Sequence, residues 1–73
     1  MRDVALAQHV QELLVHYQRL SSFPIKVTAH EGTVYLSGRV DSDEHRREAE
    51  NLVRGATGVR RVVNQLESHL GMG

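Results

Sequence analysis

The stretch Ile25-Lys26-Val27-Thr28-Ala29-His30-Glu31-Gly32-Thr33-Val34-Tyr35-Leu36-Ser37-Gly38-Arg39-Val40 decides the fold of this chain. Apolar and polar residues alternate along both halves, which is typical of β-strands that bury one face. A two-residue turn at Glu31-Gly32 places all the apolar partners on the same face. The pairs are Ala29 with Val34, Val27 with Leu36, and Ile25 with Gly38. The stretch therefore predicts a tight β-hairpin whose other face is polar.

Helical spacing precedes and follows the hairpin. From Asp3 to Leu20 an apolar stripe predicts a first helix, which ends before Pro24. A second helix begins at either Asp41 or Ser42 and ends at Thr57-Gly58, and a last strand follows from Val59 to Glu67. The inward residues of the two helices are Leu6, Ala7, Val10, Leu13, Leu14, Tyr17 and Leu20, then Ala49, Leu52, Val53 and Ala56.

The predicted order is α-β-β-α-β, with both helices on one face of a three-stranded mixed sheet. This is an α/β (α+β) fold of the two-layer sandwich type. We expect one domain over residues 1–68 and a flexible tail over 69–73. A chain of 73 residues has a small core, so contact with a partner or a second copy would add stability.

Composition excludes several classes of protein. The formal net charge is zero, so no overall field attracts nucleic acid or anionic lipid. Cysteine is absent, which excludes disulfides, thiolate zinc sites and cysteine nucleophiles. No apolar run is long enough to cross a bilayer, and the first residues do not read as a signal peptide. As written, the chain is expected in the cytoplasm. As a piece of a longer exported protein, it would be periplasmic or membrane-associated.

Two segments have a distinctive spacing of glycine and apolar residues: Gly32-x-Val34-x-Leu36-x-Gly38-x-Val40 and Gly58-Val59-x-x-Val62-x-Asn64. At this spacing they resemble the BON domain, a bacterial module named after OsmY and nodulation proteins. The resemblance covers the hairpin, the second helix and the last strand, whereas the first helix matches only in its amphipathic character. It implies a non-catalytic binding module without a cofactor. The implied partners are other proteins and anionic phospholipid at membrane surfaces.

The loop from Gly55 to Gly58 suggests an alternative. Its G-x-x-G pattern resembles the loop with which KH domains clamp an RNA backbone. In KH domains that loop joins two helices, whereas here a strand follows, so nucleic-acid binding is disfavoured. The three glycines of the hairpin and loop also have structural roles: Gly32 allows a positive φ at the turn, Gly38 lets a helix approach the sheet, and Gly58 ends the second helix.

A basic cluster follows the second helix. Between residues 51 and 66 there is no acidic residue, while Arg54, Arg60 and Arg61 are present. Guanidinium groups bind phosphate through paired hydrogen bonds, so these arginines are candidates for binding a phosphate or a lipid headgroup. The negative end of the helix dipole opposes such binding, and solvated surface arginines are the plainer interpretation.

The polar face of the sheet offers a candidate interface. Val63 is expected there, beside Tyr35, with Lys26 and Arg39 at the flanks. An apolar centre with a charged rim is typical of protein interfaces, although isolated surface valines are common. We therefore expect association with a protein partner or a second copy through this face.

The sequence offers a weak candidate for a metal site and no candidate for an active site. His9, Glu12 and His16 share one flank of the first helix and are weak candidates for a small-ion or metal site, because a lone surface helix supplies few supporting ligands. Solvated polar residues are the simpler interpretation of this flank. No nucleophile has a plausible base, and no pair of carboxylates shares an apolar pocket, so an enzyme is not expected.

Overall fold

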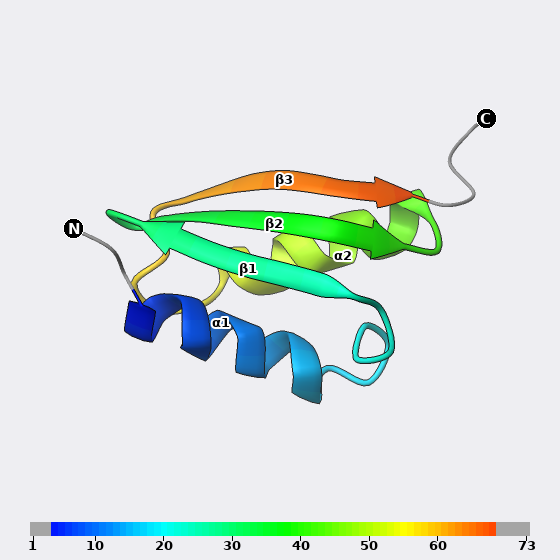
Figure 1. Cartoon of the computed structure of the whole chain (residues 1–73), viewed down its shortest axis with the longest axis horizontal. Coiled ribbons are helices and arrows are strands. Elements are labelled where there is room, and N and C mark those ends of the chain that lie inside the picture. The colour runs from blue at the N-terminus through cyan, green and yellow to red at the C-terminus, as the bar shows by residue number, and fades with distance from the viewer. Residues whose placement is uncertain (1–3, 69–73) are drawn as a thin grey trace.

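The computed structural model describes residues 4–68 and contains two helices and three strands (Figure 1). In chain order they are α1 (Val4–His16), β1 (Ile25–His30), β2 (Thr33–Val40), α2 (Asp43–Arg54) and β3 (Arg61–Ser68). The predicted order α-β-β-α-β is confirmed. The tail predicted over 69–73 lies outside the described residues.

The sheet has the order β1-β2-β3, with β1 antiparallel to β2 and β3 parallel to β2. The hairpin register is the predicted one, with Ala29 opposite Val34 and Val27 opposite Leu36. At the turn, Glu31 has a φ of 51° and Gly32 a φ of 82°. Positive φ at both positions is the conformation of the tight hairpin turns that match the twist of the strands.

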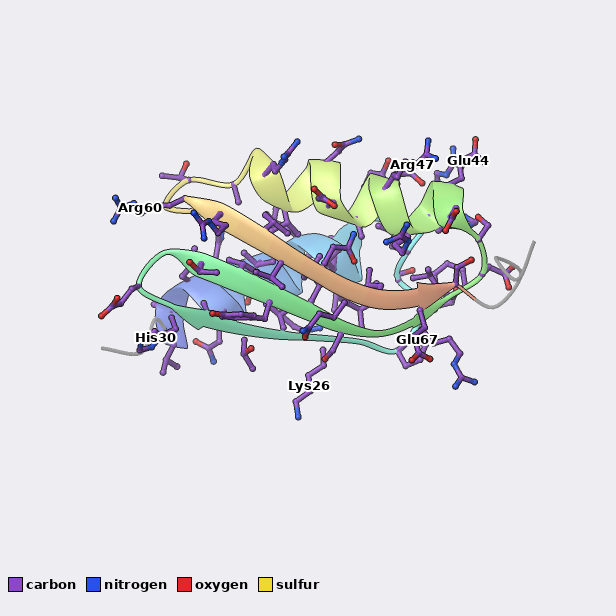
Figure 2. The ribbon with its side chains drawn as sticks, turned by 90° about the horizontal axis from the view of Figure 1, so that it is seen from above. Lys26, His30, Glu44, Arg47, Arg60 and Glu67 are labelled. Atoms are coloured by element: carbon purple, nitrogen blue, oxygen red, sulfur yellow. The ribbon has the colours of Figure 1, made fainter. Side chains whose placement is uncertain are left out.

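Both helices cover the same face of the sheet, and the side chain of Lys26 projects from the opposite face (Figure 2). α1 packs mainly against β1, while α2 packs mainly against β3. The apolar faces of the hairpin and helices meet between the layers, as predicted. The buried residues are Val10, Leu14, Leu20, Ile25, Val27, Ala29, Val34, Leu36, Val40, Ala49, Val53 and Leu66.

One predicted core residue lies elsewhere. Leu13 is half-buried and is not part of this cluster. It lines a shallow groove between the two helices, together with Leu52 and Ala56 of the second helix and its following loop. The stripe of α1 is therefore wider than the surface that it packs against the sheet.

The first helix is shorter than predicted. It ends at His16, and the chain continues through successive turns. The backbone N–H of Leu20 donates to Tyr17 O at 2.9 Å, and that of Phe23 donates to Leu20 O at 3.1 Å. Leu20 remains only 1% exposed, so the turns bury the residue that helical periodicity had assigned to the helix.

The second helix begins at Asp43, with Ser42 as its N-terminal cap, and it ends earlier than predicted. The Ser42 hydroxyl accepts the backbone N–H of His45 at 3.3 Å, which decides between the two possible caps. The helix ends at Arg54, with Gly55 as its C-terminal cap, so Gly58 does not end it. Gly58 has a φ of 93° within the loop that leads to β3. The strand begins at Arg61 rather than at Val59.

A polar contact ties the connection after α1 to α2. The Tyr17 hydroxyl donates to Glu48 Oε2 at 2.7 Å, and Arg19 Nε lies 3.3 Å from the same oxygen. The hydrogen bond to Glu48 raises the pKa of the Tyr17 phenol above its ordinary value of 10.0. The phenol therefore keeps its proton, and with it the contact, throughout the neutral pH range.

Candidate functional site

The face of the sheet away from the helices carries a small apolar centre. Tyr35 is the register partner of Val63 on β3 and of Thr28 on β1, so the three side chains form a row across the sheet. Tyr35 is 37% exposed and Val63 is half-buried. The prediction that Tyr35 and Val63 lie side by side is confirmed. We call this surface, with Lys26 and Arg39, the open face.

The charged flanks of the open face differ from each other. Lys26 is exposed and opposite Ser37, one row from the centre (Figure 2). Arg39 Nη2 lies 3.8 Å from Glu67 Oε1 on the neighbouring strand, and both side chains are largely exposed. A solvated ion pair of this kind contributes little to stability, but it neutralises one cation. Lys26 therefore contributes more uncompensated positive charge to this face than Arg39 does.

The three arginines of the basic cluster meet at one place. Arg54, Arg60 and Arg61 line a single pocket of about 190 Å³, with Val59 and Val62 between them. They come from the end of α2, from the connecting loop and from the first residue of β3. We call this the arginine pocket. Arg54 Nη2 also lies 3.8 Å from Glu50 Oε2, so one of the three guanidinium groups has a carboxylate beside it.

The path of the loop explains why Arg60 reaches this pocket. The backbone N–H of Arg60 donates to Gly32 O at 2.8 Å, which fastens the loop to the hairpin turn. A Cβ on Gly32 would lie 2.5 Å from Arg60 Cδ, so the arginine stem crosses directly over the glycine. Arg60 itself projects beyond the start of β3 (Figure 2). The turn glycine thus serves both the hairpin and the placement of Arg60.

Asn64 connects the second helix to the last strand. Its Nδ2 donates to Arg46 O at 3.0 Å and to Glu50 Oε1 at 3.2 Å, while its Oδ1 accepts the backbone N–H of Leu66 at 3.1 Å. The sequence marked Asn64 only as a position in a motif. Strand alternation places the Asn64 amide at an inward position, and a buried amide is expected to form hydrogen bonds. The role of Asn64 could have been predicted from this.

The remaining candidates are spread over the surface. His9, Glu12 and His16 are all exposed along α1. Within residues 4–68, no three histidine or acidic side chains are grouped so that they could hold a metal ion. The loop from Gly55 to Gly58 lies between α2 and β3, so it has a helix on one side and a strand on the other.

Neither helix in the described part of the chain has the length and apolarity needed to cross a membrane. No curated protein sequence matches the chain significantly. The family model for the BON domain matches residues 2–68, which is nearly the entire chain, including the first helix. The two segments that carry the resemblance lie in the hairpin turn with β2 and in the loop with β3. The chain therefore belongs to the BON domain family, whose members are regarded as phospholipid- or protein-binding modules.

Proposed function

We propose that this domain is a non-catalytic binding module that contacts protein through the open face. The main support for the proposal is the Tyr35–Val63 register pair, which lies on the side of the sheet that neither α1 nor α2 covers. Tyrosine at the centre of a flat surface supplies a large contact area and a hydroxyl for hydrogen bonding. The flanking Lys26 and the Arg39–Glu67 pair provide the polar rim that protein interfaces commonly have.

A second copy of the chain is the partner that can be tested first. Sheet faces of two copies can pack together, with Tyr35 and Val63 of each copy at the centre. Such packing would extend a core that is small in a domain of this size. The arrangement needs no cofactor and no rearrangement of either layer.

Replacing Val63 with glutamate tests this function, because it puts a charge into the middle of the contact. We expect Val63→Glu to shift a dimer towards monomer in sedimentation velocity, with the fold retained. Val15→Glu is the matched control, since Val15 is 53% exposed on α1 and lies away from the open face. A chain that stays monomeric at high concentration, or a dimer equally sensitive to both variants, would contradict the proposal.

A second candidate function is supported by the arginine pocket. Three guanidinium groups around one hollow can donate several hydrogen bonds to an anionic phosphate, as in a phospholipid headgroup. Each cation near an anionic membrane contributes on the order of 1 kcal/mol. Three give only modest affinity, and the Glu50 carboxylate beside Arg54 reduces it further. Headgroup binding would therefore need a second contact with the membrane.

Vesicle binding tests this second function. Replacing Arg54, Arg60 and Arg61 together with glutamine should abolish co-sedimentation with phosphatidylglycerol vesicles while preserving the circular dichroism spectrum. Binding by the unmodified chain should also fall steeply as salt is raised, because charge interactions are screened beyond about 8 Å at physiological ionic strength. Binding to neutral phosphatidylcholine vesicles that survives the triple replacement would exclude the arginine pocket as the headgroup site.

A further inference from the structure

The outer edge of β1 presents backbone groups that the hairpin does not use. The N–H of Arg39 donates to Pro24 O at 3.3 Å, so this pair is hydrogen-bonded across the hairpin. Hydrogen-bonded and non-hydrogen-bonded pairs alternate in an antiparallel ladder. In the observed register, Ile25, Val27 and Ala29 therefore turn their N–H and C=O groups away from β2, towards the edge.

α1 already supplies a substitute partner at one end of this edge. Gln11 Nε2 donates to Ile25 O at 3.0 Å, and the N–H of Ile25 donates to Phe23 O at 2.9 Å. A side-chain amide thus makes the bond that a neighbouring strand would make. Within residues 4–68, no group makes a hydrogen bond with the outward N–H and C=O of Val27 and Ala29.

A groove lies along this edge. It has a volume of about 280 Å³ and is formed by one side of α1 and the strand, which run next to each other (Figure 1). Its residues include Val4, Ala7, Gln8 and Gln11 on the helix and Val27 and Ala29 on the strand. Val4 is 63% exposed, although it begins an amphipathic helix. We call this surface the edge groove.

The edge groove restricts the chemistry of an occupant in two ways. The outward N–H and C=O groups belong to every second residue of β1. An extended peptide backbone presents its own N–H and C=O groups at the same spacing and can pair with them. Among residues 4–68, none of those that line the groove is charged. A charged side chain would lose hydration there without gaining a partner, which disfavours acidic and basic segments. Small apolar side chains fit against Val4 and Ala7.

We propose that the edge groove binds an extended, uncharged peptide segment of a partner protein, which adds to the sheet as a fourth strand beside β1. Backbone hydrogen bonds to Val27 and Ala29 would supply affinity, and alternate side chains would enter the groove towards α1. This contact differs from the open face, because it uses the edge of the sheet and the flank of a helix, and only Thr28 borders both surfaces. The two surfaces can therefore be tested independently.

The test uses the full isotope-labelled chain and a short capped peptide that alternates valine with serine and threonine. We expect saturable amide shifts at Val27 and Ala29 in nuclear magnetic resonance spectra, with slower hydrogen exchange at both. A matched peptide with lysine in place of each valine should bind at least roughly tenfold more weakly, which corresponds to about 1.4 kcal/mol of binding free energy.

Two variants of the chain assign the site. Gln8→Trp should block the groove and weaken peptide binding, whereas Gln18→Trp, at an exposed position after α1, should bind like the unmodified chain. Ala29→Pro should also abolish binding, because it removes an outward donor that the hairpin does not use. Val63→Glu should leave peptide binding unchanged.

Three outcomes would overturn the proposal. One is the absence of saturable shifts at Val27 and Ala29. The second is a set of shifts centred on Tyr35 and Val63, which would place the peptide on the open face. The third is equal peptide affinity of Gln8→Trp and Gln18→Trp, with Ala29→Pro still folded and still binding.

Discussion

Gly38 is the residue at which the hairpin tolerates least change. Its φ of 125° lies outside the range that L-residues with side chains ordinarily adopt. A Cβ there would also collide with the backbone carbonyl oxygen of Pro24. The two effects are independent, because one concerns local backbone conformation and the other concerns the segment that enters β1. Both require glycine.

Replacing Gly38 with alanine should therefore destabilise the domain, and Gly55→Ala provides the control. We expect Gly38→Ala to lower the free energy of unfolding by at least about 1–3 kcal/mol, the usual cost of a strained backbone. Gly55 has a φ of −80°, and its nearest neighbouring atom would be 3.6 Å from an added Cβ. Its replacement should be neutral or stabilise by about 0.4–1 kcal/mol. Equal urea midpoints for the two variants would contradict this explanation.

The sequence indicated that Gly38 matters, but for a different reason. The prediction was that a helix approaches the sheet there, whereas the close neighbour is the backbone of Pro24. The path of the chain before a strand depends on tertiary packing, which alternation of residues does not report. Gly32 was predicted correctly, because the demand for positive φ in a two-residue turn is local.

Among the elements, Asn64 joins α2 to β3, two parts of the structure that the sequence treats separately. Its amide holds Arg46 O and Glu50 on α2, and its carbonyl oxygen accepts the Leu66 N–H on β3. In the parallel ladder, Leu66 turns its N–H towards the outer edge of β3. Asn64 therefore ties helix to strand and also occupies part of an exposed strand edge.

Asn64→Ala should cost about 1–3 kcal/mol of unfolding free energy, because the Leu66 N–H and the Arg46 carbonyl lose a partner in a half-buried place. Gln65 is the matched control, since it is the next residue, also an amide, and exposed. We expect Gln65→Ala to change stability by less than about 0.5 kcal/mol. Thermal or urea unfolding measures both. A cost at Asn64 no larger than that at Gln65 would show that these hydrogen bonds contribute little.

The elements were predictable in kind and order, but not at every boundary. The two-residue alternation of the hairpin determines its register, because a shift by one residue would turn the apolar side chains to the wrong face. The end of α1 was wrong by a few residues, since Leu20 fits helical spacing although it is buried by turns. Leu20 must be apolar because it is buried, and this requirement is the same whether the backbone there is helical or forms turns.

Over residues 4–68 as a whole, α1 and α2 cover one side of the sheet and leave the open face on the other side uncovered. The sequence predicted that Tyr35 and Val63 lie near each other on the open face, because strand alternation determines which residues face away from the helices. It also identified Arg54, Arg60 and Arg61 by the absence of nearby acids in the chain. It did not place Glu50 beside Arg54, and it did not reveal the edge groove, whose two walls are distant in sequence.

Association of two copies through the open face can be measured by a dilution series of the isotope-labelled chain. The amide chemical shifts are recorded at each concentration. The proposal predicts concentration-dependent shifts that centre on Thr28, Tyr35 and Val63, extend to Lys26, and disappear in Val63→Glu. Shifts confined to α1 and α2, or spectra that do not change up to the solubility limit, would contradict it.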